Sequence, residues 1–142
     1  MTGVSEMRLL KYKVVKTYFE LNEHFQYKKE KINLEPVFKR DVAKLDDQKY
    51  EITLGISISS DHYQYAVPFN VEVIIKALFE MNDWEKVEMK TLAIDNATAI
   101  LFPYLRTLLA NVTMNGNVPP YMLPIMNVAM LFNEKQKETF KQ

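Results

Sequence analysis

The sequence predicts an α+β fold in which two main C-terminal helices pack on one face of a four-stranded antiparallel sheet. Through residues 1–80, hydrophobic residues mostly alternate with polar ones, which is the period of a half-buried strand. Across residues 95–133 they recur at three- and four-residue steps, which is the period of an amphipathic helix. Strands followed by helices are typical of α+β proteins, in which helices collect on one face of an antiparallel sheet.

The first two strands are expected upstream of residue 40. Leu10–Leu21 is rich in β-branched and aromatic residues, and residues 22–30 have weak periodicity and are typical of a loop. A shorter strand is predicted from Ile32 through Leu34 towards Phe38.

The other two strands form a predicted hairpin. The first alternates over residues 50–59, and Ser60 and Asp61 mark the turn that follows it. The second covers residues 63–75 and should pair antiparallel with the first because the turn is short. Pro68 cannot donate to a ladder, so we expect a bulge, an edge position or a break there.

The helical half is expected to consist of a helix, a proline-rich crossover and a second helix. Asp95 or Thr98 is predicted as the N-cap of the first helix, and Gly116 as its stop. Pro103 is tolerated in a first turn, so the regular helix begins near Leu101 or else kinks. The inward stripe comprises Ala97, Leu101, Tyr104, Leu105, Leu108 and Val112.

Beyond Gly116, three prolines make residues 117–126 an expected extended crossover. Asn127 is the expected cap of the last helix, from which Val128, Leu131 and Phe132 face inward. Residues 134–142 form a polar tail, and a weaker helical turn is expected over 83–89. We interpret residues 1–142 as a single domain.

Composition narrows the function. The chain has no cysteine, which excludes disulfides and thiolate chemistry, and no apolar stretch long enough for stable insertion in a membrane. No signal-peptide layout is present, so a cytoplasmic location is expected. Eighteen basic residues balance eighteen acidic ones, which argues against nucleic acid as a partner.

Enzymatic signatures are missing. His24 and His62 stand in no metal-ligand spacing and are expected to face solvent, and no GxSxG elbow, Walker loop or GxGxxG occurs. We therefore predict a non-enzyme without cofactor or metal. A small-ligand-binding or enzymatic α+β domain is the alternative of another class, and it would need a closed pocket with convergent polar groups.

One segment carries specific information. Residues 100–106 read Ile100-Leu101-Phe102-Pro103-Tyr104-Leu105-Arg106, which resembles the pattern I-L-F-P-Y-x-R that opens the first helix of SecB, the cytoplasmic protein-export chaperone. Downstream, residues 117–120 resemble the turn after that helix, and Leu123–Phe132 resembles the entry of the second helix with its proline displaced by one position.

The resemblance implies a function and an assembly. SecB-like proteins are ATP-independent holdases that form homotetramers, as dimers of dimers, and bind unfolded polypeptide clients in apolar grooves. By this resemblance, Tyr104 and Phe132 are predicted to contact the client. Tyr121, Met122 and Met126 are added because aromatic rings and methionines suit promiscuous contacts. Ile32 and Leu34 complete the predicted client site because they alternate on the predicted short strand.

Single motif positions leave alternatives open. Leu101, Leu105 and Leu108 are expected in the core, and either Phe102 or Tyr104 is expected to look outward. Arg106 either pairs with a carboxylate across subunits or is solvated.

Charge separates two partner hypotheses. Export SecB proteins are typically acidic and use sheet carboxylates to dock on the SecA motor, whereas residues 1–45 here hold ten basic and six acidic side chains. Protein export is the main reading from the family, but the acidic pattern on which SecA docking relies is not visible in this chain. The alternative is a SecB-like chaperone dedicated to an antitoxin in a toxin–antitoxin system.

Overall fold

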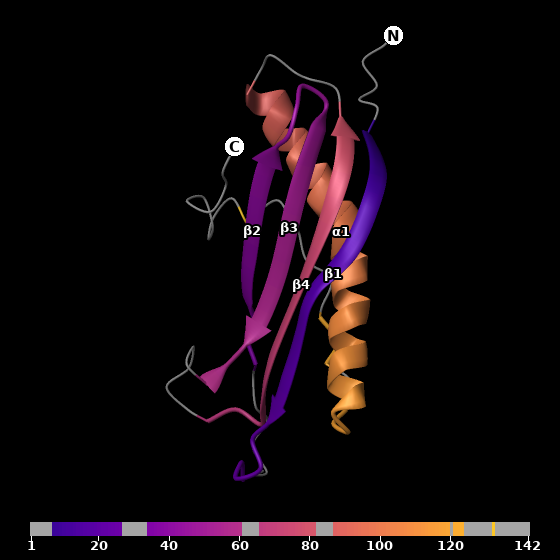
Figure 1. The fold of residues 1–142 in the computed structure, drawn as a ribbon. Coiled ribbons are helices and arrows are strands. Elements are labelled where there is room, and N and C mark those ends of the chain that lie inside the picture. The colour runs from indigo at the N-terminus through magenta and orange to yellow at the C-terminus, as the bar shows by residue number, and fades with distance from the viewer. Residues whose placement is uncertain are drawn as a thin grey trace.

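The computed structural model describes residues 7–26, 34–60, 66–81, 87–119, 121–123 and 132, with residues 87–89 described by their backbone alone. Its elements are β1 (Met7–Leu21), β2 (Val37–Lys44), β3 (Lys49–Ile58), β4 (Phe69–Met81) and α1 (Val87–Asn115). Figure 1 shows α1 lying along one face of a long, twisted sheet.

The four strands form one antiparallel sheet in the order β1-β4-β3-β2. The predicted fold class is therefore confirmed, as is the antiparallel pairing of the two strands on either side of residues 60–61. Strands β1 and β2 lie at the two edges of the sheet. Strand β4 begins at Phe69, directly after Pro68. The proline therefore lies just before the strand, in residues without strand structure, and does not interrupt the strand.

The prediction of a strand from Ile32 towards Phe38 was wrong in its position. Leu34–Pro36 carry no strand, and β2 begins at Val37 and continues to Lys44. Its inward residues are Phe38, Arg40 and Val42, all buried. Because Arg40 is charged although it is buried, the alternation of apolar and polar residues along β2 cannot be recognised in the sequence.

Helix α1 begins at Val87, within the residues where only a helical turn was expected, and Pro103 lies well inside it on the exposed side. The prediction that Asp95 or Thr98 caps the helix was therefore wrong. Both residues lie in the middle of the helix, away from its ends, and their buried side chains face Arg40 of β2. Tertiary contact, not capping, explains their positions.

The end of α1 confirms the predicted stop but changes its reason. Asn117, not Gly116, takes the left-handed backbone conformation, with φ of 63°. A Cβ on Gly116 would lie 2.3 Å from the ring of Phe19 on β1. Glycine is therefore required for close packing of the helix end on the edge strand.

The second predicted helix lies mostly outside the described residues. Phe132 is described and is helical, and residues 121–123 have no regular structure, as expected for the described part of the crossover. Asn127, Val128 and Leu131 fall outside the description.

The sheet has an inner face, which packs on α1, and an outer face. Alternate residues of β3 and β4 point inward and are almost fully buried, including Ile52, Leu54, Ile75 and Phe79. The helix supplies Ala97, Leu101, Leu105 and Leu109 to the same core. The outer face carries cross-strand ion pairs, such as Arg8 with Glu80 at 2.7 Å and Lys76 with Glu51 at 3.8 Å.

Candidate functional site

Exposed apolar side chains gather on one edge strand and on the helix beside it. Twelve large hydrophobic residues among the described ones are between 37% and 57% exposed. Six of them lie on β1 and four on α1: Leu10, Tyr12, Val14, Val15, Tyr18, Leu21, Leu92, Ile100, Tyr104 and Met114. We call this surface, apart from Tyr18, which points to the outer face of the sheet, the β1–α1 face. Because monomeric proteins rarely gather so many exposed apolar groups, it is a candidate for protein contact.

The solvent side of α1 is almost uncharged. From Thr91 to Asn115 the only charged residues are Asp95 and Arg106, and Asp95 is buried. The exposed side of a helix that faces water normally carries charged and polar residues. Moreover, Nε of Arg106 is buried and has no hydrogen-bond partner within the described part of the chain. This side of α1 therefore has the character of a contact surface.

Two tyrosines join the helix to the edge strand. The rings of Tyr12 and Tyr104 lie 4.9 Å apart between centroids, at an interplanar angle of 34°. Partial burial raises the pKa of the Tyr12 hydroxyl, and the neighbouring Tyr104 raises this pKa further. Phe102 is 7% exposed whereas Tyr104 is 44% exposed. Of these two motif residues, it is thus Tyr104 that looks outward.

A second group of predicted site residues lies at the start of the crossover. The hydroxyl of Tyr121 donates a hydrogen bond to the carbonyl of Leu34 at 3.0 Å, and its backbone N–H donates to Oγ1 of Thr113 at 2.8 Å. Burial raises the pKa of the Tyr121 hydroxyl, with a smaller contribution from Glu35. Met122, the next residue along the chain, is 57% exposed. We call Leu34, Tyr121 and Met122 the crossover cluster.

A buried polar group supports the opposite edge of the sheet. Nη1 of Arg40 lies 2.9 Å from Oδ1 of Asp95 and 3.1 Å from Oγ1 of Thr98. The guanidinium carbon lies 4.6 Å from the centroid of the Phe132 ring, which also meets Phe38 edge-on. Arg40 therefore connects edge strand β2, helix α1 and the segment that contains Phe132.

The structure divides the predicted site residues. Leu34, Tyr121 and Met122 come together in the crossover cluster, whereas Tyr104 contacts edge strand β1. Phe132 is 1% exposed and contacts β2, so its ring fills the interior and cannot itself form an open surface. Ile32 and Met126 lie outside the described residues. Of the motif residues, Leu101 and Phe102 are buried, and Ile100 and Pro103 are exposed.

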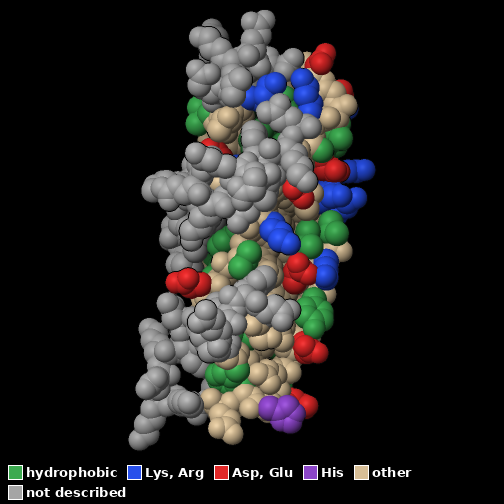
Figure 2. All heavy atoms as spheres, turned by 90° about the vertical axis from the view of Figure 1, so that its left-hand side faces the viewer, with side chains coloured by type: hydrophobic (Ala, Val, Ile, Leu, Met, Phe, Trp, Pro, Cys, Tyr) green, Lys and Arg blue, Asp and Glu red, His purple; other side chains and the backbone are tan. Residues whose placement is uncertain are grey.

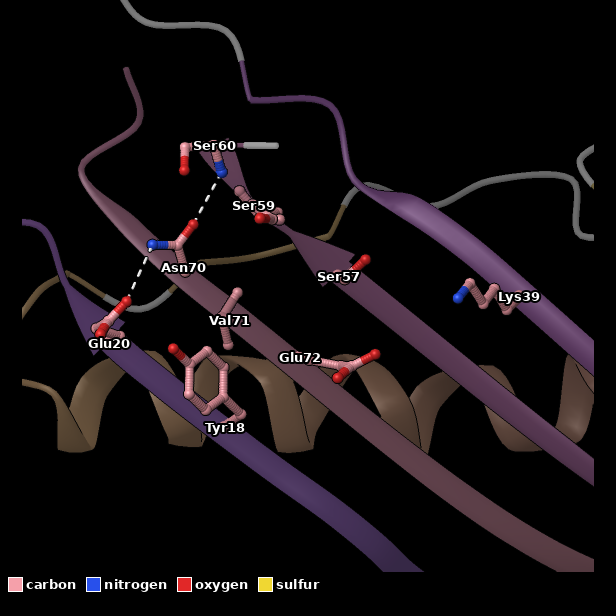
Figure 3. A pocket seen from close by; sticks show the side chains of 10 residues that line it. Tyr18, Glu20, Lys39, Ser57, Ser59, Ser60, Asn70, Val71 and Glu72 are labelled. Carbon is pink, nitrogen blue, oxygen red and sulfur yellow. Dashed lines mark hydrogen bonds between the residues drawn. The ribbon is translucent and has the colours of Figure 1, made fainter. Parts of the chain in front are cut away.

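The outer face of the sheet holds a polar hollow of about 520 Å³. Figure 3 shows Tyr18, Glu20, Asn70 and Glu72 standing on the side of the sheet turned away from the helix, with Lys39 across the hollow. Asn70 accepts a hydrogen bond from the backbone of Ser60 at 2.8 Å and approaches Glu20 at 3.5 Å. The hollow is open and its groups bond to one another, unlike a closed pocket with convergent reactive groups.

Other site types find no support in the part of the chain that is described. His24 is exposed, and no group of three or more metal-ligating side chains occurs among these residues. None of the described helices is long and apolar enough to span a bilayer. In the view of Figure 2, acidic and basic side chains are interspersed with hydrophobic ones between the grey atoms.

Comparison with known proteins identifies the family. The family model of the preprotein translocase subunit SecB matches residues 18–139, which include four of the five elements completely and the end of β1. The chain belongs to the SecB family. A SecB protein-export protein of Mesorhizobium japonicum is 28% identical over 94 residues, which cover 66% of this chain and 56% of the relative. An uncharacterised protein of Methanocaldococcus jannaschii is 38% identical over 79 residues, which cover 53% of this chain and 51% of that protein. These matches thus span only a little over half the length of the curated relatives.

A solved structure supports the fold of this SecB-family member. The SecB-like chaperone of Mycobacterium tuberculosis, determined in complex with a peptide from an antitoxin, has a TM-score of 0.65 and 16% identity. The similarity covers 84% of this chain and 90% of that one. At this identity the likeness concerns the arrangement of the sheet and helix.

Sequence reasoning missed the β1–α1 face and the Arg40 cluster. The lack of charged residues between Asp95 and Arg106 was visible in the sequence. It could have indicated a helix that is covered by protein on the side away from the sheet as well as on the side that packs on the sheet. The pairing of Arg40 with Asp95 joins residues 55 positions apart, and no local pattern contains it.

Proposed function

We propose that this SecB-family chain is an ATP-independent holdase that binds unfolded polypeptides as a homotetramer. The observation that carries the proposal is the exposed apolar β1–α1 face, together with the crossover cluster. Many weak apolar contacts, each of about 25 cal/mol per Å² buried, give affinity without sequence specificity. Such binding needs neither nucleotide nor metal, which agrees with a non-enzymatic role.

Two surfaces favour self-association as a dimer of dimers. Within the described residues β1 pairs with β4 on one side only, so its other edge offers backbone groups for pairing with another strand. The uncharged side of α1 offers a separate apolar surface for contact with a second layer of protein. Since the two surfaces belong to different elements, one can join two copies and the other can join two such pairs.

The proposed client site includes the crossover cluster, with Tyr104 as a separate exposed contact. Met122 is flexible and 57% exposed, which suits contact with varied apolar side chains. Ile32 and Met126 remain proposed members of the site. For Phe132 we propose a supporting role, because its ring is buried against Arg40 and Phe38.

Two biological settings fit this activity. Protein export in the cytoplasm is favoured by the family and by the protein-export relatives. The setting of the Mycobacterium tuberculosis chaperone, which holds an antitoxin peptide, is favoured by the formal net charge of zero, because docking of SecA in the family relies on acidic sheet residues. Binding of purified SecA, set against binding of an antitoxin peptide, distinguishes the two.

Aggregation assays test the holdase proposal. The purified chain should suppress aggregation of a chemically unfolded client without ATP, and light scattering coupled to size exclusion should give the mass of a tetramer. Tyr104→Ala combined with Met122→Ala should reduce suppression several-fold. The matched control is Leu45→Ala, since Leu45 is 56% exposed in the turn between β2 and β3.

The outcomes are distinct. A monodisperse monomer that leaves client aggregation unchanged would contradict the holdase proposal. A double variant that suppresses aggregation as well as the unmodified chain would contradict the site assignment alone.

A further inference from the structure

Arg106 is a cation of helix α1 without a counter-ion among the described residues. No hydrogen bond or ion pair joins it to another of these residues, and its Nε is buried. The other charged residue between Thr91 and Asn115 is Asp95, whose carboxylate lies 2.9 Å from Arg40. A buried donor without an acceptor is costly, so an arginine in this state requires an explanation.

The position of Arg106 on the helix places it beside the crossover cluster. Residues four and seven positions apart lie on one side of an α-helix. Phe102, about one turn before Arg106, stacks on Phe38 of β2 at 6.0 Å between ring centroids. Thr113, about two turns after Arg106, accepts the backbone N–H of Tyr121 at 2.8 Å. Arg106 therefore lies on the side of α1 that faces β2 and the crossover cluster.

The polar groups around the crossover cluster already have partners. The hydroxyl of Tyr121 donates to the carbonyl of Leu34, and its backbone N–H donates to Thr113. The hydroxyl of Thr113 donates in turn to the carbonyl of Leu109 on its own helix, at 3.0 Å. The guanidinium of Arg106 differs from these groups, because its N–H groups are bound to no described residue.

A bound unfolded segment brings acceptors to this place. Every residue of an extended polypeptide carries a main-chain carbonyl, and an apolar surface that covers it excludes the water to which that oxygen was bonded. Arg106 is partly exposed and has several N–H donors, and burial of Nε limits the motion of the group before a segment binds. Because all polypeptides have main-chain carbonyls, such a bond adds affinity without selecting a sequence.

We propose that Arg106 donates hydrogen bonds to main-chain carbonyl groups of the bound client, beside the apolar contacts of the crossover cluster. The inference rests on the proposed holdase function and adds a polar member to its client site. The bond requires an extended segment, because the carbonyl groups inside a helix are already bonded within that helix. It therefore favours unfolded segments over helical ones.

Peptide binding tests the role of Arg106. Three labelled peptides share one apolar sequence and carry Glu, Gln or Lys at the centre, and fluorescence anisotropy gives their affinities. Arg106→Met should weaken binding of all three about tenfold, because hydrogen bonds to a charged group are lost. Arg106→Lys should keep part of the affinity, because the ammonium still donates. The matched control Lys90→Met removes a positive charge from the same helix about four turns away and should bind like the unmodified chain.

Two results would contradict the main-chain assignment. Unchanged affinities for all three peptides would remove Arg106 from the client site. A loss confined to the Glu peptide would show that Arg106 binds a side-chain carboxylate instead. Light scattering on the same samples should give equal masses for Arg106→Met and the unmodified chain; a lower mass would assign the guanidinium to a contact between copies and overturn its client role.

Esters in the peptide backbone give an independent test. Replacement of alternate amides of the Gln peptide by esters weakens its carbonyl acceptors. Arg106→Met should then cost this peptide less affinity than it costs the amide peptide, and a double-mutant cycle measures the difference as a coupling. Equal losses for the two peptides would mean that the carbonyl groups are not the acceptors.

The same measurements separate this inference from the proposed function. If the unmodified chain binds the peptides and suppresses client aggregation, and Arg106→Met does both equally well, the inference alone is overturned. An unmodified chain that binds none of the peptides and leaves clients unprotected overturns both.

Discussion

The buried ion pair between Arg40 and Asp95 gives the sharpest stability prediction. Their side chains are 3% and 10% exposed, and Nη1 of Arg40 also bonds to Thr98. Asp95→Ala removes this carboxylate and its 2.9 Å contact with the buried guanidinium. Removal of one partner of a buried pair costs about 3–5 kcal/mol, against a total unfolding free energy of about 5–15 kcal/mol for a domain. We therefore expect Asp95→Ala to lose about a fifth or more of the stability.

The expected loss depends on the remaining charge, and a second substitution isolates this cause. Arg40→Met removes the guanidinium while an unbranched apolar side chain fills the space beside Phe132. Combined with Asp95→Leu, it replaces the pair by apolar groups, a change that is often neutral or stabilising. The double variant should therefore be more stable than Asp95→Ala by about 2 kcal/mol or more.

Urea unfolding followed by circular dichroism measures both effects. Because association adds to apparent stability, all variants are compared at one chain concentration. A lower midpoint with an unchanged slope identifies a loss of stability. If Asp95→Ala lost less than about 1 kcal/mol, the reasoning that Arg40 depends on this carboxylate would be refuted.

Three further predictions concern single contacts. Gly116→Ala should destabilise by about 1–3 kcal/mol in urea unfolding, because its Cβ meets the Phe19 ring at 2.3 Å; Phe19→Leu should relieve part of this loss. Tyr121→Phe should cost about 1 kcal/mol through the lost hydrogen bond to Leu34, and equal stability would show that water replaces it. The N–H groups of Gln48 and Lys49 donate to Asp46 and lower its pKa. The stability from this carboxylate is thus present above its ordinary pKa and is lost as pH falls through the lowered value. Asp46→Asn should flatten the dependence of the urea midpoint on pH in that acid range, and an unchanged profile would contradict this assignment.

Much of the fold could be predicted from the sequence because it follows from local periodicity. Burial alternates along the whole of β4, and along β3 except at Gly55, since one face of each strand is almost fully buried. The end of α1 at Gly116 and the break before β4 at Pro68 could be predicted because glycine often ends helices and proline cannot donate a backbone hydrogen bond within a sheet. The position of strand β2 was not predicted correctly, because the side chain at its centre, Arg40, is charged and yet points into the core.

The candidate site was only partly predictable, because exposure depends on neighbours that are distant in sequence. The motif identified Tyr104 and Phe102 but left open which of the two faces outward. In the structure Phe102 is buried in the core, whereas Tyr104 lies at the surface against Tyr12 of β1. Phe132 matched a motif position equally well, yet its ring is enclosed by Phe38 and Arg40. The sequence alone thus determined the strand and helix periods, the absence of cysteine chemistry and the resemblance to SecB. Tertiary structure decided which apolar residues stay at the surface, since that depends on whether a partner from another element covers them.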